Sequence, residues 1–503
     1  MVNKIFSYFF LLSSSLFSQS PIGFIDNYSG IQTVLLNPAN ILDTPYQYDV
    51  NILSFNANAG NNYYSLDPFK VLGDLNFGLN DIKPTYSAYK YNRKLESSFG
   101  IGNINKYLIS KSTSENSNFY GNAVVLGPSF LWTINNYNAV AFSSSIKTYG
   151  HAFNLNTKLY NQILDKMFVN KDFDSKDELN EFMNQLAINS TNSSQVFSWA
   201  EIGFSYAGIA KQTANDFLKF GFTLKLLRGI RKVAVYSDDL KLDFNYDEDD
   251  PENSTLNFTG KATNSYSRLG ANFGMGLDFG FVYEKRNKTF PINLRDDNGS
   301  VYYSKAPYSY KIGVAITDLG FLKYNNVRTN SENPNLINVN LDSENYTFNI
   351  RDYIHITSLK TTSQTYFLPT TARINVDYNI LKNYFINSNV DVYMLSNSSR
   401  KQIKYISNFV VSPRYESKHF SAFLPVSINR FGIFKAGIGF RTGYFFVGSS
   451  SLFTNLTTYS KEGDFFLGIK IPVYNKKVNK QYKNSLDYQL IHPPKLKEKQ
   501  ISN

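Results

Sequence analysis

Cysteine is absent from the 503-residue sequence. A chain without cysteine forms no disulfide, offers no thiolate nucleophile or thiolate-bound zinc, and has no residue for lipoprotein acylation. Histidine is nearly as scarce: His151, His355, His419 and His492 are scattered, without the spacing of a metal site or an acid–base pair. We therefore expect no catalytic residue, no metal, no cofactor and no enzymatic activity.

Long apolar runs are also missing. Beyond residues 5–17, no stretch approaches the roughly 20 apolar residues that a membrane-spanning helix needs. Residues 1–18 contain Lys4, that apolar run and a small polar end, which predicts a secretory signal peptide cleaved before Gln19. We expect export, and any contact with a membrane must then be made by strands.

The formal net charge of +11 could indicate a nucleic-acid partner. However, seven lysines between residues 475 and 503 face only Asp487 and Glu498, so this tail alone carries 7 − 2 = +5. The remaining charge is spread thinly and forms no concentrated phosphate-binding patch. We expect no nucleic-acid partner, and a solvated basic tail of residues 475–503 in the periplasm.

The stretch from Arg268 to Tyr283 alternates with period two. Even positions are mostly polar or glycine, and all odd positions are apolar: Leu269, Ala271, Phe273, Met275, Leu277, Phe279, Phe281 and Tyr283. Successive side chains of a strand point to opposite faces, so one face meets an apolar medium and the other a wet one. The length suits a strand that crosses a bilayer, which needs about 9–11 residues.

Comparable alternation recurs along the chain, at residues 46–57, 121–134, 137–150, 200–207, 219–226, 308–317, 371–380, 384–394, 405–415, 420–429, 434–441, 444–453 and 465–473. The aromatic content of 16% suits the girdles at two membrane interfaces. These features predict an all-β fold: a transmembrane antiparallel β-barrel of about 14 strands over residues 46–474. Leu179, Phe182, Met183 and Leu186 follow helical spacing and predict a small helix in a loop.

The connections on both sides of residues 308–317 are long, although a barrel strand has a long outward loop at only one end. Two explanations remain open. Either residues 285–306 form an unusually long periplasmic turn, or strands are missing from residues 336–356, where Ile337, Val339 and Leu341 alternate.

Asn37-Pro38-Ala39 forms a rigid turn after an apolar segment, because proline fixes its own φ and restricts the preceding residue. The turn either ties down a chain end or belongs to an N-terminal segment folded into a barrel. Gly274, Gly276 and Gly280 lie inside a strand without a following helix, which excludes a dinucleotide fingerprint. Small residues there would relieve crowding or let a plug backbone approach.

Together with the runs Ala200–Ala207, Gly221–Gly229 and Gly313–Gly320, the Asn37-Pro38-Ala39 turn resembles the FadL/PorV-like superfamily of outer-membrane β-barrels, and most closely an uncharacterised Bacteroidota branch. The resemblance implies an N-terminal plug or hatch at residues 19–45, contact with lipid of a Gram-negative outer membrane, and passive uptake of a hydrophobic or amphipathic small molecule. The alternative is a non-transporting scaffold or shuttle that holds a secreted or surface protein.

Charged residues on the inferred lumen face are the remaining candidates, because they alternate with apolar side chains: Asp278, Lys311, Arg373, Asp377, Lys435 and Arg441. They could line a path for a solute. They could equally form a self-neutralising network, since narrow barrels are filled by their own side chains.

Overall fold

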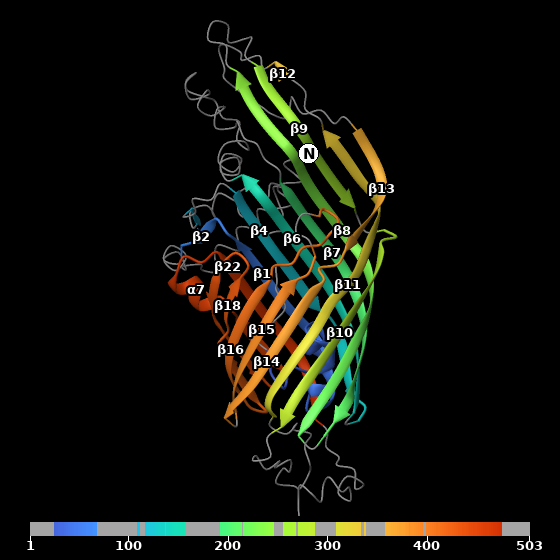
Figure 1. Ribbon diagram of the computed structural model, residues 1–503, viewed down its shortest axis with the longest axis vertical. Helices are drawn as coiled ribbons and strands as arrows, with labels where there is room; N and C mark the ends of the chain where they lie inside the picture. The colour runs from blue at the N-terminus through green and yellow to red at the C-terminus, as the bar shows by residue number, and fades with distance from the viewer. Residues whose placement is uncertain are drawn as a thin grey trace, which may run out of the picture.

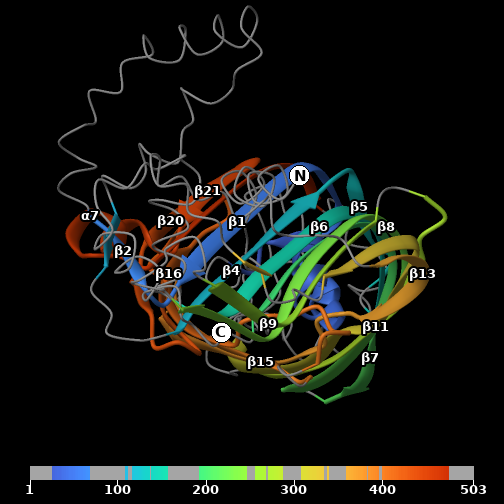
Figure 2. The ribbon, with the colours of Figure 1, turned by 90° about the horizontal axis from the view of Figure 1, so that it is seen from above.

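The computed structural model describes residues 25–67, 108–110, 116–135, 137–156, 192–213, 215–245, 255–267, 270–286, 308–332, 337–338, 358–381, 383–395 and 399–474. Within these residues, one antiparallel sheet closes on itself into a barrel (Figures 1 and 2). The predicted all-β barrel is confirmed. The predicted loop helix around Leu179 lies outside the described residues.

The first half of the wall consists of β1 (Tyr46–Asn61), β4 (Asn116–Leu126), β5 (Ser129–Thr133), β6 (Asn138–Asn156), β7 (Ser193–Gln212), β8 (Asp216–Asn245), β9 (Thr255–Ser267), β10 (Phe273–Arg286) and β11 (Tyr308–Glu332). The second half consists of β13 (Ser358–Phe367), β14 (Thr371–Leu381), β15 (Tyr384–Tyr393), β16 (Asn408–Glu416), β17 (Phe420–Phe423), β18 (Val426–Asn429), β19 (Phe434–Ala436), β20 (Ile438–Thr442), β21 (Phe445–Ser449) and β22 (Glu462–Tyr474). Small additions are β2 (Tyr64–Leu66), β3 (Leu108–Ser110) and β12 (Ile337–Asn338).

The ring closes at β1, whose Phe55 pairs with Val125 of β4 on one side and with Leu467 of β22 on the other. The pairs β4/β5, β9/β10, β13/β14, β17/β18 and β19/β20 each occupy one position in the wall. The described strands therefore give a ring of 14 strand positions, as predicted. β8, β9, β11 and β13 continue beyond the wall at one end as a tall extension (Figure 1).

The outer surface of the barrel is apolar. On β10, Phe273, Met275, Phe279 and Phe281 are between 44% and 55% exposed, whereas Asp278 between them is buried. Similar outward-facing rows of aliphatic and aromatic side chains occur on β7, β8, β11 and β14. An apolar surface of this extent would be unstable in water and indicates a barrel that lies in a bilayer.

Three short helices complete the described chain: the 3₁₀ helices η2 (Gly30–Leu35) and η3 (Pro38–Asp43), and α7 (Leu452–Thr457). Among the described residues, none of the helices is long and apolar enough to cross a membrane. We use "turn end" for the barrel end with the tight β5–β6, β7–β8 and β20–β21 turns, and "mouth" for the opposite end.

Several predicted strand boundaries were wrong. β10 begins at Phe273, so the described residues 270–272 of the predicted strand lie outside it. The predicted strand over residues 444–453 ends at Ser449, where the chain turns into α7. Arg286 pairs with Tyr308 at the turn end, so the connection between β10 and β11 starts and finishes at that end, as in the first of the two explanations. Residues 336–356 also contain a short strand, β12, as in the second.

Candidate functional site

Residues 25–45, which we call the N-terminal plug, lie inside the ring of strands (Figure 2). The Asn37 side chain caps η3 by accepting a 2.9 Å hydrogen bond from the backbone N–H of Ala39, and Pro38 occupies the first helical position, where its missing N–H has no cost. Asn37 also donates its amide to the carbonyls of Phe281 on β10 and Val314 on β11, at 3.2 and 3.5 Å. One side chain thus holds the turn together and attaches it to the wall.

Three glycines of the wall leave room for this turn, because they have no side chains. A Cβ on Gly221 of β8 would lie 2.5 Å from Ala39 N and from Pro38 C, and a Cβ on Gly280 of β10 would overlap the Asn37 carboxamide. Gly280 pairs directly with Gly221, and Gly313 of β11 faces Asn37 from the next strand. Of the three strand glycines named in the sequence analysis, only Gly280 faces the plug, and there the Asn37 side chain approaches; Gly274 and Gly276 face wall and mouth residues, and plug backbone approaches at Gly221.

Ion pairs hold both ends of the plug. Asp26 pairs with Arg441 of β20 at 2.7 Å, and Asp43 pairs with Lys219 of β8, which also pairs with Glu284 of β10. Lys311 donates to Asn27 at 2.7 Å. In the described chain, no strand of the sheet pairs with the plug, so side-chain contacts carry most of its attachment.

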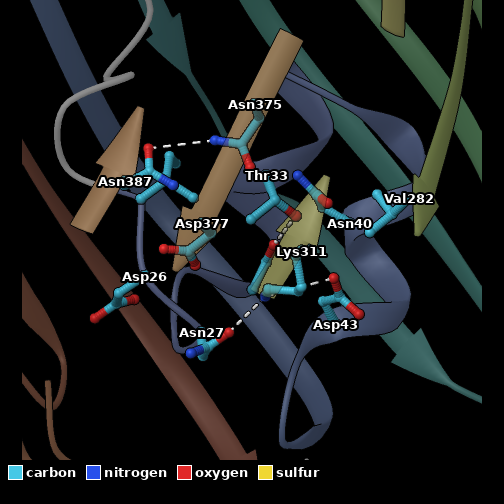
Figure 3. Close-up of a pocket in the computed structure, with 12 residues that line it drawn as sticks. Asp26, Asn27, Thr33, Asn40, Asp43, Val282, Lys311, Asn375, Asp377 and Asn387 are labelled. Carbon is cyan, nitrogen blue, oxygen red and sulfur yellow. Dashed lines mark hydrogen bonds and ion pairs between the residues drawn. The ribbon is translucent and has the colours of Figure 1, made fainter. Parts of the chain in front are cut away.

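A narrow polar recess lies between the plug and the wall on the side of β11, β14 and β15 (Figure 3). Asp26, Asn27 and Asp43 of the plug face Lys311 and Asp377 across it. At its edge, Asn375 of β14 donates to Asn387 and Asn389 of β15 at 3.2 and 2.6 Å. The plug is thus tightly seated against β8 and β10 and more loosely against this polar side.

A second polar cluster lies on the mouth side of the plug, along the inner face of β6, β7, β8, β10 and β11. Lys225 lies 2.7 Å from both Asp278 and Asp318, and Lys147 lies 3.1 Å from both Asp318 and Glu201. Asp318 reaches this position through a bulge in β11, where its φ is 56° and its N–H donates to Asp278 at 2.7 Å. We call these five residues the ionic layer.

The structure distributes the six predicted lumen residues among separate clusters. All six side chains point inward, and all but the partly buried Lys311 are buried. Lys311 and Arg441 contact the plug, whereas Asp278 belongs to the ionic layer. The others pair with wall residues: Arg373 with Asp391 at 3.5 Å, Asp377 with Arg414 at 2.7 Å, and Lys435 with Glu462 at 2.6 Å.

An apolar cluster inside the mouth was missed by the sequence analysis. We call it the mouth cluster, and its buried members are Tyr149, Phe197, Trp199, Leu227, Leu322, Tyr324, Val327, Tyr366, Leu368, Tyr393, Ile403 and Tyr405. Trp199 stacks on Tyr149 with their rings 5.3 Å apart. Ile403 and Tyr405 come from the β15–β16 connection, which folds into the barrel and which the sequence analysis had partly assigned to a strand.

Next to the mouth cluster is a small cavity, which we call the His151 cavity. Two atoms of its lining, His151 Nε2 and Asn122 Oδ1, are buried without a hydrogen-bond partner among the described residues. The Lys404 ammonium, also in the lining, lies 5.0 Å from the Phe153 ring centre, and no described carboxylate pairs with it. Unsatisfied polar atoms of this kind are costly, so the cavity is suited to a polar guest.

Acid should loosen the plug only well below neutral pH. Burial raises the pKa of Asp26, but the Arg441 guanidinium and the Ser421 hydroxyl outweigh burial and hold that pKa below its usual 3.8. A lowered pKa stabilises the folded arrangement above the unfolded pKa, and the stabilisation is lost as pH falls through the folded pKa. Protonation of Asp26 should therefore weaken its contact with Arg441, and so raise bilayer conductance, only below about pH 4. Asp26→Asn should already conduct at pH 7, and an Asp26→Asn barrel that stays closed would contradict the assignment.

Comparison with known proteins finds one matching sequence family and several similar solved structures. The sequence matches, over residues 38–450, the family described as "Family of unknown function (DUF5723)". No curated protein matches the chain in sequence. Similar solved structures include the toluene transporter TbuX of Ralstonia pickettii, with 8% identity, TM-score 0.41, 92% of this chain and 100% of that chain covered.

Two further structures belong to the same group. The toluene transporter TodX of Pseudomonas putida matches with 9% identity and TM-score 0.39, covering 91% of this chain and 95% of that chain. A Pseudomonas aeruginosa FadL homologue matches with 9% identity and TM-score 0.28, covering 91% and 100%. At these TM-scores the similarity does not support a residue-by-residue comparison. A function must therefore be argued from the side chains inside this barrel.

Proposed function

The chain belongs to DUF5723, a family of unknown function, and from its interior we propose an outer-membrane barrel for the passive uptake of a hydrophobic or amphipathic small molecule. The mouth cluster is the observation that carries this proposal. The interior of a barrel that passes only water and ions is polar, whereas here Phe197, Trp199 and Tyr324 are buried side by side inside the mouth. Such side chains can separate to admit an apolar guest.

The His151 cavity supports the amphipathic form of the guest. Tyr149 and Tyr405 belong to both the mouth cluster and the cavity lining, so the apolar and polar surfaces are continuous. A molecule with its apolar part among the aromatic rings would place a polar head near Lys404, His151 and Asn122. That head would supply the partners that these buried groups lack.

Passage requires the barrel to open, because the ionic layer and the plug lie below the mouth cluster. The plug is held by side-chain contacts, and a narrow polar recess already lies between it and β11, β14 and β15. We propose that displacement of the plug opens the turn end. Residues 1–18 would then be the signal peptide, residues 19–45 the complete plug, and residues 475–503 a periplasmic tail.

A scaffold for a secreted or surface protein is the second candidate. The filled interior favours it, since the docked plug, the mouth cluster and the paired charges of the ionic layer all occupy the inside of the barrel among the described residues. A scaffold needs no opening, and it would carry its partner outside the barrel.

The two tryptophans allow a direct test of uptake. Trp199 is fully buried in the mouth cluster, and Trp132 is 39% exposed on the outer surface, where detergent covers it. In Trp132→Phe, a bromine-labelled aliphatic carboxylate is expected to quench Trp199 fluorescence saturably. Lys404→Gln should weaken this binding about tenfold or more, because a hydrogen bond to a charged group contributes about 1.5–3 kcal/mol.

Trp199→Phe is the matched control, because its only tryptophan reports partitioning into detergent. Quenching of Trp132 fluorescence in this variant should rise with ligand concentration without saturating. Equal, unsaturable quenching of both single-tryptophan variants would rule out the uptake proposal. Native mass spectrometry of the purified barrel then decides the alternative, since a bound protein at fixed stoichiometry would support the scaffold.

A further inference from the structure

The upper border of the apolar belt is sharp on the tall side of the barrel. Leu226, Met275, Phe321 and Phe367 form one cross-strand row over β8, β10, β11 and β13. Two residues further toward the mouth, the outward positions are Arg228, Phe273, Lys323 and Thr365, with Lys323 paired to both Phe273 and Thr365. The outer surface therefore changes from wholly apolar to partly cationic within about 7 Å, since a strand rises about 3.3 Å per residue.

We call Arg228, Lys323 and Arg328 the cationic edge. Arg228 and Arg328 are exposed, Lys323 is half-exposed, and all three lie on the outward face of the wall. Among the described outward-facing side chains of this part of β8, β10, β11 and β13, none is acidic. Carboxylates of the same strands, such as Asp278 and Asp318, point into the barrel instead.

The turn end presents a different border. Its outward positions hold tyrosines, and Tyr137, Tyr378, Tyr384 and Tyr444 are each more than half exposed. The outward cation Lys285 of β10 is paired there with Asp216 at 2.7 Å. Tyrosine at this depth suits a neutral interface, because its ring is apolar and its hydroxyl reaches water. The two borders of the belt are thus chemically distinct, which points to a distinct surrounding at the mouth.

We propose that the cationic edge binds phosphate groups of lipid headgroups in the leaflet that surrounds the mouth. The edge begins where the acyl chains end, so its charges lie at headgroup depth. Guanidinium groups bind phosphate through two parallel hydrogen bonds, and the Lys323 ammonium, 6.0 Å from the Phe273 ring centre, adds a point charge. The extension carries Arg328 further out, where a large headgroup would reach it.

Lipid retention in native mass spectrometry tests the proposal. The full-length barrel in detergent is incubated with phosphatidic acid or with phosphatidylcholine of the same acyl chains. We expect preferential retention of phosphatidic acid, weakened at least about tenfold in Arg228→Gln/Lys323→Gln/Arg328→Gln, and weakened by high salt because exposed charges are screened. Retention should be unchanged in Lys211→Gln/Lys401→Gln/Arg430→Gln, which removes three exposed cations outside the cationic edge.

Two results would overturn the proposal. One is equal retention of phosphatidic acid by the two triple variants, with both barrels shown to be folded by heat-modifiable gel mobility. The other is displacement of the lipid by equimolar inorganic phosphate, which would indicate a free-ion site. If the triple variant does not fold, the single variant Lys323→Gln and the salt series on the unaltered protein test the proposal in its place. Uptake of a solute is not involved, so this test stands apart from the proposed function.

Discussion

Replacing Gly221 with alanine is expected to expel the N-terminal plug and convert the closed barrel into a conducting one. The added Cβ would lie 2.5 Å from the backbone of Pro38 and Ala39, closer than side-chain carbons approach other atoms. The strand cannot retreat, because Gly221 is paired on both sides, with Ala207 and Gly280. Overpacking of this kind costs about 1–3 kcal/mol, which corresponds to roughly a 5- to 150-fold shift toward the undocked plug.

Conductance in planar bilayers measures the open state, and thiol labelling reports the plug itself. The chain has no cysteine, so Thr33→Cys introduces a single thiol into a buried position of η2. That thiol should react slowly in the otherwise unaltered barrel and quickly beside Gly221→Ala. Gly463→Ala is the matched control, because the nearest atom to its Cβ would be 3.5 Å away. Unchanged conductance in Gly221→Ala would mean that the plug does not seal the barrel.

The wall of the barrel could be predicted because strand alternation is a local property. Every second residue of β10 meets lipid, so Phe273 to Phe281 show the period within one short window. The inward direction of charges such as Arg373 and Lys435 followed from the same alternation. The alternation did not predict which residues these charges contact inside the barrel.

Partners of the inward charges could not be predicted, because they come from distant parts of the chain. Asp26 and Arg441 are separated by 415 residues, and only the closure of the ring brings them together. Asp318 faces the lumen beside Thr317 only because β11 bulges there, and alternation alone would have turned one of the two outward. No residue type in that stretch of the sequence indicates the bulge.

The mouth cluster did leave a signal that was overlooked. Phe197 and Trp199 share parity with Glu201 and Gly203, which face inward on β7. Beginning the predicted strand at Ala200 left these two residues out of the lumen set, although β7 begins at Ser193. Bulky aromatic residues at inward positions are the pattern that could have indicated an apolar guest.

Replacing Lys219 with methionine is expected to destabilise the folded barrel more than any other single change considered. The Lys219 side chain is 1% exposed and pairs with Asp43 of the plug and Glu284 of β10. Removing one partner of a buried ion pair costs about 3–5 kcal/mol, because the remaining charge stays buried and uncompensated. Arg286 lies 2.7 Å from Glu284 and Lys311 lies 3.6 Å from Asp43, so we expect about 3 kcal/mol.

Equilibrium unfolding in denaturant, followed in detergent, measures this loss. The triple variant Lys219→Met/Asp43→Asn/Glu284→Gln should recover most of the stability, since it removes the uncompensated carboxylates together with the ammonium. Lys211→Met, at an exposed site of the same turn end, should unfold like the unaltered protein. Gly221→Ala separates the two roles of this region, because it should release the plug while leaving the Lys219–Glu284 pair of the wall intact. A Lys219→Met barrel that unfolds at the same denaturant concentration as the parent would show that the pair contributes only to docking.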